Sequence, residues 1–547
     1  MSAVRGRDGT CERLDVVVIG AGITGIHQLY RLLEAGFEAR ILEAASDVGG
    51  TWYWNRYPGA RFDSESHSYG YFFSRELFDE WDWREHFAAQ PETEEYLQFA
   101  VDRLGLRSRI QLNTRVTDLR FDPDENGWEL DTADGGRLRA RFVVAATGQL
   151  SAPYIPDIPG RQDFTGEAHH TGLWPHRPVV LAGRRVAVVG AGASAVQIVP
   201  VIAPEVASLT VYQRTANWCT PLNNAPITPQ EQAEFKNRYD DIYRACHDTF
   251  SGFTHRDGTR RTFDDTPEQR EAFYEDLWLS PGFRKMFSNY CDLATDRAAN
   301  AEYCAFIEKK IRSIVRDPMV ADRLIPKDHG FGEKRPPMET GYYEAFNREN
   351  VELVDLRQTP LLRATATGLQ TSDTHREHDL IVWATGFDAF TGALSRIRVA
   401  GAEGRLLVDY WAEGPRTHLG IQVPGFPNLF MVGGPQSTYG NVPRSTESHV
   451  EFVSGLLRHA REVGAGRVAV TEAAAHAWTK HVEEVAAMLL TAETAWYQGS
   501  NIPGKPQRML LYPGGVKAWA TRAREVAEGG YDGFEFSGKH EPVAAAG

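Results

Sequence analysis

The sequence predicts an α/β fold in which two βαβ units belong to separate domains, the second inserted into the first. Glycine-rich turns at 20–25 and 190–195 each follow a β-branched run and precede a segment with helical periodicity. Apolar runs at 141–150 and 378–388 each contain Ala-Thr-Gly and lie on either side of the second turn. Turns of this kind let the backbone pass close to a cofactor, although an ordinary loop explains either run alone. Because the runs bracket the second unit, we expect that unit to interrupt a domain formed by both ends of the chain.

The expected domain boundaries follow from these positions. Residues 1–150 form the first part of one domain and residues 385–547 form its second part, while residues 151–384 form the inserted domain. Between 218 and 330 the composition becomes charged and aromatic, which indicates a helical excursion of the inserted domain.

Apolar periodicity predicts individual helices in these regions. From Phe235 to Cys246, aromatic and apolar residues recur at spacings of four and three, which favours one amphipathic helix whose aromatic side chains pack in a core. Residues 449–466 and 473–490 predict two further helices near the C-terminus.

The first βαβ unit has the spacing Gly20-x-Gly22-x-x-Gly25 of a dinucleotide-binding turn. The strand Val16–Ile19 precedes the turn, and a second strand ends on Glu43, 23 residues after Gly20. The glycines permit a tight turn and let the backbone approach a pyrophosphate at the helix N-terminus. An acid at this distance accepts hydrogen bonds from a ribose 2′-hydroxyl. We therefore expect a Rossmann-like domain that binds FAD.

The second unit repeats this pattern with one difference in charge. Its turn has the spacing Gly190-x-Gly192-x-x-Ala195, and its second strand ends on Arg214, 24 residues after Gly190, where the first unit has an acid. The planar guanidinium of arginine suits a phosphate, so the sequence predicts NADPH rather than NADH. A surface arginine at a strand end is the alternative. One chain with both sites indicates a flavin-dependent oxidoreductase.

Composition argues against several other classes. The 547 residues carry a formal net charge of −14, which disfavours binding to nucleic acid or to an anionic membrane. No apolar run reaches the roughly 18 residues of a membrane span, and the N-terminus leads directly into the first glycine turn, so we expect no signal peptide. Five cysteines without a C-x-x-C pair indicate reduced thiols in the cytoplasm and argue against a dithiol flavoprotein reductase. No Cys/His cluster has zinc spacing, so we expect no metal.

A further motif, Phe164-x-Gly166-x-x-x-His170-x-x-x-Trp174-Pro175, lies just before the second glycine turn. It resembles the fingerprint of the type I Baeyer–Villiger monooxygenases, flavoenzymes that insert oxygen beside a ketone. Related N-hydroxylating and flavin-containing monooxygenases have a similar stretch without the Trp-Pro ending. The resemblance covers most of the chain and includes GGTWYWNRYPGARFDSES (49–66), EKRPPMETGYYEAFNREN (333–350) and WYQGSNIPGKP (496–506).

The resemblance implies a reaction and roles for particular residues. NADPH and O2 would convert a ketone into an ester or lactone through a flavin C4a-peroxide. Arg335 matches the family's active-site cation, and Asp63 matches the acid that pairs with it. The fingerprint would couple NADPH binding to domain rearrangement, which gives His170 a conformational role.

The resemblance also implies cofactor contacts beyond the glycine turns. Those toward FAD are Gly50, Thr51, Trp52 and Asp63. Those toward NADP are Trp54, Thr215, Lys334 and Trp496. Lys334 would be a second contact to the 2′-phosphate, and Trp496 begins a Gly- and Pro-rich stretch suited to a lid. Composition alone is equally compatible with core tryptophans and solvated loop charges.

Other activities remain open from sequence. The protein could oxygenate a soft nitrogen or sulfur atom, act as an uncoupled NADPH oxidase, or bind FAD and NADP as a sensor without turnover. We expect a small-molecule ketone and O2 as reactants and a monomer or weak homo-oligomer. The identity of the ketone depends on loops such as 433–445, whose conformation the sequence does not give.

Overall fold

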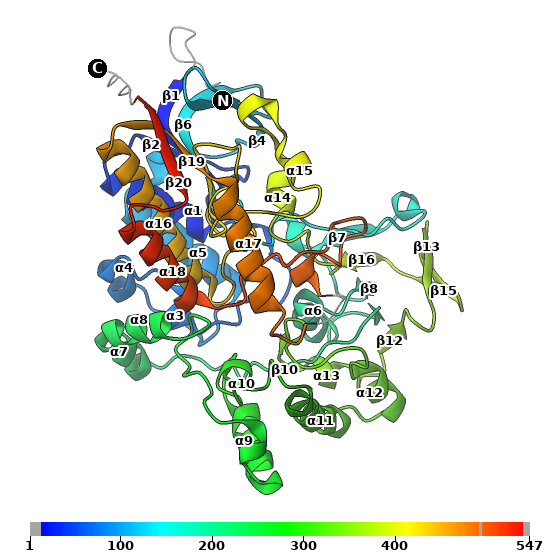
Figure 1. Ribbon diagram of the computed structural model, residues 1–547. Helices are drawn as coiled ribbons and strands as arrows, with labels where there is room; N and C mark the ends of the chain where they lie inside the picture. The colour runs from blue at the N-terminus through cyan, green and yellow to red at the C-terminus, as the bar shows by residue number, and fades with distance from the viewer. Residues whose placement is uncertain (1–11, 492–494, 540–547) are drawn as a thin grey trace.

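The computed structural model describes residues 12–491 and 495–539, and its two largest β-sheets lie in different parts of the molecule (Figure 1). Residues 1–11, part of the N-terminus for which we expect no signal peptide, lie outside the described part.

The first sheet has the strand order β17-β4-β5-β6-β1-β2-β3, and β18 also pairs with β6. Its strands are β1 (Glu12–Ile19), β2 (Ala39–Leu42), β3 (Ile110–Gln111), β4 (Val116–Asp122), β5 (Gly127–Thr132), β6 (Arg137–Ala145), β17 (Arg398–Ala400) and β18 (Leu429–Met431). Strands β2, β1, β6 and β18 are parallel, while β4 and β5 form antiparallel pairs. Strands from both ends of the chain therefore share one sheet, with its core on both faces.

Helices cover this first sheet. They are α1 (Ile23–Glu34), α2 (Thr51–Trp54), α3 (Ser66–Tyr69), α4 (Arg75–Glu80), α5 (Gln90–Arg103), α14 (Gly392–Ser395), α15 (Leu407–Tyr410), α16 (Val442–Glu462), α17 (Glu472–Ala486) and α18 (Val516–Glu528). Helix α1 packs between β1 and α16, where Gln28 Nε2 donates to Ser454 Oγ at 2.9 Å. The two ends of the chain are thus held together by both the sheet and its helices.

The second sheet is parallel and has the order β12-β9-β8-β16-β7. Its strands are β7 (Glu167–His170), β8 (Arg185–Val189), β9 (Ser208–Gln213), β12 (Val351–Asp355) and β16 (Leu380–Trp383). Apolar runs buried on both faces are typical of a parallel sheet covered by helices. Here α6 (Ala193–Ile202) and α13 (Tyr342–Ala345) lie on one face. The other face packs against β13 (Leu361–Thr365) and β14 (Gly368–Thr371), which form a small sheet with β15 (His375–Glu377).

Two adjacent chain segments join the two sheets. Tyr154 N donates to Gly386 O at 3.0 Å, and Asp388 N donates to Ala152 O at 2.8 Å. Pro153 and Phe387 form an isolated antiparallel bridge between these hydrogen bonds. The entry to the second sheet and the exit from it therefore run side by side.

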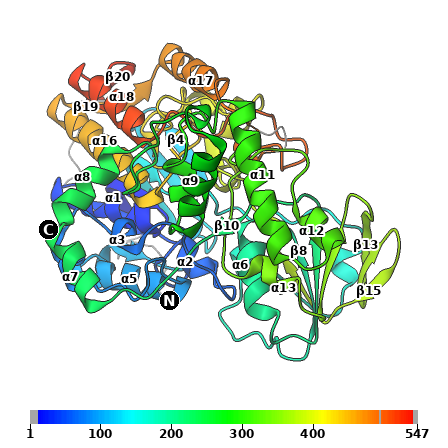
Figure 2. The ribbon, with the colours of Figure 1, turned by 90° about the horizontal axis from the view of Figure 1, so that it is seen from below.

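The helical excursion lies between β9 and β12 in the chain. Its elements are β10 (Thr220–Pro221), α7 (Pro229–Asn237), α8 (Tyr239–Asp248), α9 (Pro267–Leu279), α10 (Arg284–Phe287), α11 (Arg297–Ile314), α12 (Pro318–Leu324) and β11 (Met338–Glu339). Figure 2 shows α7 and α8 beside the first sheet's helices, and α11 and α12 beside α13 of the second sheet. The excursion therefore contacts both parts of the molecule.

Three predicted helices differ from those observed. The helix expected from Phe235 to Cys246 is broken at Arg238, whose ψ of 19° is not helical. Its apolar residues still meet in one cluster, because Phe235 and Tyr239 pack beside Ile242 and Cys246.

The predicted C-terminal helices have different bounds. Helix α16 begins seven residues before the predicted 449, and the end of that prediction is β19 (Ala465–Val470), which pairs with β20 (Phe534–Lys539). Helix α17 ends at Ala486 rather than 490. Periodicity identified the apolar faces but not the polar first turns or the short strand.

Candidate active site between the two sheets

One cavity extends from the first glycine turn to the second and has a volume of about 1570 Å³. Both turns line it, together with Glu43, Arg214 and the Arg335–Asp63 pair. Side chains of the excursion and of the C-terminal segment complete its walls, among them Phe283, Tyr439, Trp496 and Leu511. An elongated cavity with a glycine turn at each end has room for two extended ligands.

The first glycine turn leaves no space for side chains except toward the cavity. Gly20 has φ +106°, and a Cβ there would lie 2.6 Å from Ala146 O. A Cβ on Gly25 would lie 1.9 Å from Gly20 O, so only glycine allows α1 to approach the turn. Gly22 is the N-cap of α1, which turns the free N–H groups of the first helical turn toward a bound anion.

Glu43 lies at the end of β2, as predicted, with both carboxylate oxygens in use. Oε2 accepts from Ala21 N at 2.6 Å, and Oε1 accepts from Ala45 N at 2.7 Å. Burial raises the pKa of Glu43, and these N–H groups oppose the shift. A buried carboxylate beside the glycine turn fits a ribose hydroxyl, since it has further lone pairs to offer.

The segment at 49–52 closes over the first turn. Gly50 has φ +55°, and a Cβ there would lie 2.7 Å from Gly22 Cα. Thr51 begins α2, and Trp52 is buried with its Nε1 donating to Tyr69 Oη at 3.0 Å. Together the two loops form a narrow backbone cradle that fits the pyrophosphate of a dinucleotide.

The second glycine turn has the same construction. Gly190 has φ +130°, and a Cβ there would lie 2.2 Å from Ala384 O. Ala195 is buried in α6, so the methyl group is accommodated where the first unit has glycine. A Cβ on Gly192, the N-cap of α6, would meet no described atom within 4 Å and would project into open space. That space lies where an anion would approach the helix N-terminus.

Cations gather at the end of β9. Arg214 is exposed beside the cavity, and the charges of Arg214 and Lys334 interact. Burial lowers the pKa of Lys334, and nearby Asp328 opposes this. Thr215 follows Arg214, and its Oγ1 accepts from Arg357 Nη2 at 3.3 Å. Hydroxyl and cationic groups in this arrangement suit a phosphate.

Arg335 and Asp63, 272 residues apart, form an ion pair in the centre of the cavity wall. Arg335 Nη2 donates to Asp63 Oδ2 at 2.5 Å. The Asp63 side chain is 3% exposed and that of Arg335 is 22% exposed. Burial raises the pKa of Asp63, and Arg335 counteracts the shift. Burial alone would lower the pKa of Arg335, but Tyr439 and Asp63 outweigh it, so that the pKa is raised.

Two residues that the sequence did not identify hold this pair. Gln197 of α6 donates from Nε2 to Arg61 O at 3.0 Å and contacts Asp63 Oδ1 at 3.5 Å. Its Oε1 accepts from Tyr57 Oη at 2.6 Å. The helix that begins at the second glycine turn therefore touches the carboxylate opposite Arg335. No local motif marks Gln197, because its role depends on a contact between distant segments.

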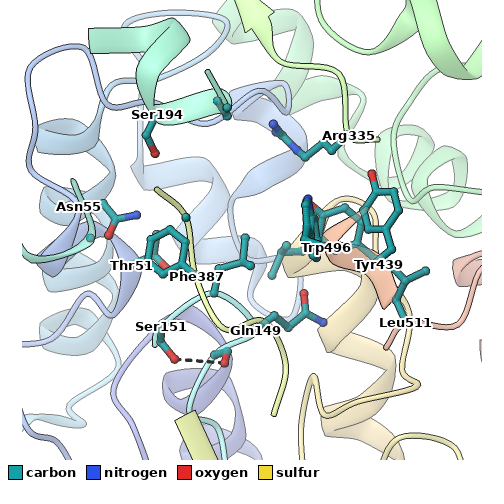
Figure 3. A pocket seen from close by; sticks show the side chains of 18 of the residues that line it. Thr51, Asn55, Gln149, Ser151, Ser194, Arg335, Phe387, Tyr439, Trp496 and Leu511 are labelled. Atoms are coloured by element: carbon teal, nitrogen blue, oxygen red, sulfur yellow. Dashed lines mark hydrogen bonds between the residues drawn. The ribbon is translucent and has the colours of Figure 1, made fainter. Parts of the chain in front are cut away.

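Aromatic side chains form the wall next to Arg335. Trp496 and Tyr439 have ring centroids 5.5 Å apart in an edge-on arrangement, and Figure 3 shows them side by side near Arg335. The Arg335 guanidinium also lies 5.4 Å from the Phe283 ring centroid. Trp54 lines the cavity from α2. Figure 3 places Thr51 of α2 and Asn55, which follows that helix, across the cavity from Trp496 and Tyr439.

The loop at 433–445 is fixed by hydrogen bonds on the side that faces away from the cavity. Gln436 Oε1 accepts from Thr417 N and Thr479 Oγ1 at 3.1 and 3.0 Å, so the Gln436 side chain points into the protein. Tyr439 of the same loop lines the cavity.

His170 lies where the two connecting segments meet. Its Nδ1 accepts from Gly172 N at 2.9 Å, so the proton resides on Nε2, which donates to Gly386 O at 3.0 Å. Burial lowers the pKa of His170 to about 4. The neutral imidazole thus joins β7 to the Ala-Thr-Gly turn that leads back to the first sheet.

The remaining fingerprint residues surround His170. A Cβ on Gly166 would lie 2.5 Å from the Phe164 ring, so glycine lets that ring pack against the second sheet. Trp174 is buried, and its N donates to Trp54 O at 3.3 Å. Pro175 follows half-buried. These five residues do not line the cavity, although Gly172 and Leu173 of the same stretch do.

The C-terminal stretch at 496–506 is attached to one of the connecting segments. Asn501 Nδ2 donates to Phe387 O at 2.9 Å, and Lys505 Nζ bonds to Asp388 and, at 3.1 Å, to Ala389 O. Neither residue was singled out from sequence. Trp496 is thereby tied to the same junction as His170.

Metal and membrane features can be assessed for residues 12–491 and 495–539. No group of His, Cys, Asp and Glu there could hold a metal ion. No helix in the same ranges has the length and apolar character needed to span a bilayer.

Known proteins resemble this chain over nearly its whole length. Residues 17–271 match the family described as pyridine nucleotide-disulphide oxidoreductase. The chain is 41% identical to 2-oxo-Δ3-4,5,5-trimethylcyclopentenylacetyl-CoA monooxygenase of Pseudomonas putida, covering 96% of this chain and 98% of the relative. It is 40% identical to acetone monooxygenase (methyl acetate-forming) of Gordonia sp. (strain TY-5), covering 96% and 99%. Phenazine N-monooxygenase of Lysobacter antibioticus is 39% identical, covering 96% of this chain and 98% of the relative.

Solved structures are equally similar. The crystal structure of OTEMO in complex with FAD and NADP has a TM-score of 0.94 at 41% identity, covering 96% of this chain and all of that one. The closed crystal structure of cyclohexanone monooxygenase also has a TM-score of 0.94, at 40% identity and the same coverage. These matches confirm the predicted α/β fold with two dinucleotide-binding domains.

Proposed function

Because the chain belongs to the Baeyer–Villiger monooxygenases, we propose that it uses NADPH and O2 to convert a ketone into an ester or lactone. The observation that carries this proposal is the Arg335–Asp63 pair, which places a fixed positive charge in a cavity bounded by two dinucleotide turns.

The cavity residues fit both cofactors. FAD would be held by Gly20, Gly22, Gly25, Glu43, Gly50, Thr51, Trp52 and Asp63. NADP would be held by Trp54, Gly190, Gly192, Ala195, Arg214, Thr215, Lys334 and Trp496. When bound, NADPH supplies the hydride that reduces FAD, and reduced FAD supplies the activation of O2. Two glycine turns that each precede a helix N-terminus and line the cavity, the second with open space at Gly192, support this assignment.

Arg335 would provide electrostatic stabilisation. Negative charge grows on oxygen as oxygen is transferred to a carbonyl carbon, and a positioned donor in a dry site lowers that barrier. Asp63 is a nearly buried acceptor that keeps the guanidinium in place, because a flexible arginine would lose orientation. Gln197 and Tyr57 support Asp63 from the side of α6.

Trp496, Tyr439 and Phe283 would keep water away from the reacting atoms. Water competes with the ketone and releases hydrogen peroxide, so an apolar wall favours oxygen transfer. His170, Asn501 and Lys505 join this wall to the connecting segments, which supports a conformational role for the fingerprint.

We also propose a cytoplasmic protein that is a monomer or weak homo-oligomer. The cysteines support the cytoplasmic location, since Cys219, Cys246, Cys291 and Cys304 are free. Size-exclusion chromatography with light scattering measures the assembly directly.

A test of the reaction uses purified yellow protein, NADPH and a panel of ketones of graded size. We expect NADPH loss to be accelerated by an accepted ketone and one atom of ¹⁸O₂ to appear in the ester by mass spectrometry. An aromatic N-heterocycle in the same panel tests the activity suggested by the phenazine-oxidising relative. N-oxide formation without any ester would overturn the proposal, as would NADPH oxidation that yields only hydrogen peroxide.

A further inference from the structure

Arg357, at the end of β12, lies beside the cations expected to bind the 2′-phosphate of NADPH. Its Nη2 donates to Thr215 Oγ1 at 3.3 Å and to Asp328 Oδ2 at 2.5 Å. The preceding residue, Leu356, lines the cavity. Arg357 therefore reaches the end of β9 from the neighbouring strand of the second sheet.

An acid lies in the middle of this cationic group. Asp328 contacts Arg357, and its Oδ2 is 3.9 Å from Lys334 Nζ. Its Oδ1 is 2.7 Å from His329 Nδ1. Burial alone would raise the pKa of Asp328, but hydrogen bonds from His329 and Arg357 outweigh it and lower the pKa to about 2. Asp328 is therefore a carboxylate at neutral pH.

The charges at this site explain why an additional cation is needed. A phosphate monoester carries about −1.5 to −2 at neutral pH. Arg214 and Lys334 supply two positive charges, but Asp328 cancels one of them. His329 adds none near neutral pH, because burial lowers its pKa. Arg357 raises the net charge of these groups from +1 to +2, and the Glu333 charge, which also acts on Lys334, increases the need for this third cation opposite a dianion.

We propose that Arg357 is a third cation for the 2′-phosphate and a determinant of the preference for NADPH over NADH. Asp328 holds the Arg357 guanidinium next to Thr215, and Arg357 in turn offsets the carboxylate that would otherwise repel the phosphate. The proposal rests on the proposed function, because it requires NADPH to bind at the second glycine turn.

Calorimetric titration of the FAD-loaded enzyme with 2′,5′-ADP, and with 5′-AMP as the ligand lacking the 2′-phosphate, tests this role without turnover. Arg357→Ala should weaken 2′,5′-ADP binding about fivefold, less than a fully buried charge-assisted contact, because the side chain is half exposed. Affinity for 5′-AMP should stay unchanged. Arg357→Lys should retain most of the affinity, since it keeps the charge.

Two further variants make the outcome unambiguous. Arg348→Ala removes an exposed arginine of the same domain that bonds to Asn350, and it should leave both affinities unchanged. Arg214→Ala should weaken 2′,5′-ADP binding and shows that the phosphate occupies the expected site. Unchanged 2′,5′-ADP affinity in Arg357→Ala, with a loss in Arg214→Ala, would overturn the role of Arg357 and leave the proposed function intact. Equal losses for 2′,5′-ADP and 5′-AMP would also overturn it, because the phosphate would not be what Arg357 binds. If Arg214→Ala too has no effect, the coenzyme site itself is misplaced.

Discussion

Replacing Arg335 with alanine removes a charge from the cavity and leaves the Asp63 carboxylate without its partner. Loss of one preorganised donor typically costs about 10²–10³ in rate, or about 2.7–4 kcal/mol of transition-state stabilisation. Asp63 is 3% exposed, and its pKa is already raised by burial. Breaking a buried ion pair from one side costs about 3–5 kcal/mol of folding free energy, less whatever Asp63 recovers by binding a proton. We therefore expect both ester formation and stability to fall.

Separate assays distinguish the two losses. Gas chromatography should show ester formation reduced by about 10³. Anaerobic flavin reduction by NADPH should survive, and oxygen consumption should yield hydrogen peroxide instead of ester. Urea denaturation measures the stability loss. Arg335→Lys should rescue poorly, because an ammonium on a flexible stem lacks the planar fork of the guanidinium.

Matched variants show whether the chemistry or the fold is affected. The double variant Arg335→Ala/Asp63→Asn removes the unpaired carboxylate, so stability should recover while ester formation does not. Asp63→Ala alone should resemble Arg335→Ala in a milder form. Arg185→Ala breaks an exposed pair with Asp379 and should cost less than about 1 kcal/mol. Undiminished ester formation by Arg335→Ala would mean that another cation acts on the ketone.

Three further predictions concern the coenzyme, the junction and the lid. Arg214→Ala should raise the KM for NADPH about 10- to 150-fold and leave that for NADH nearly unchanged, and equal use of both coenzymes by the unmutated enzyme would contradict the assignment. Burial lowers the pKa of His170 from 6.5 to about 4, so its contribution to stability is complete above pH 6.5 and is lost as the pH falls through 4. The difference in unfolding free energy between the unmutated protein and His170→Gln should shrink by up to about 3 kcal/mol over that range, whereas a constant difference would speak against a buried neutral imidazole. Lys505→Ala, which releases the stretch after Trp496 from Asp388, should increase hydrogen peroxide release per NADPH consumed, and an unchanged ratio would argue against a lid.

The local parts of the fold and site could be predicted because their geometry depends on nearby residues. Gly20 and Gly25 lie in a turn whose backbone atoms would collide with a Cβ, and Gly190 repeats that constraint. The charge at the end of β9 could also be found, since the distance from turn to strand end varies little among βαβ units.

Contacts between distant segments could not be derived from spacing. Arg335 and Asp63 were indicated only by resemblance to a family, because nothing in the local sequence brings them together. Gln197 and Arg357 were missed for the same reason. The break at Arg238 was missed because the apolar spacing continues across it. The domain boundaries remain predictions, and the variants described above test the roles of individual site residues.

The paired connections at Pro153 and Phe387 have a mechanical consequence. The two segments that connect the sheets are joined here by an isolated bridge and its hydrogen bonds, and such a connection resists stretching more than bending. Any rotation of the second sheet relative to the first would therefore turn about this bridge. Because Asn501 Nδ2 donates to Phe387 O at this bridge, a small rotation there would be passed to the stretch that begins at Trp496. The far end of the second sheet would move through a larger distance. Such a rotation would displace the Trp496 stretch and the second glycine turn together.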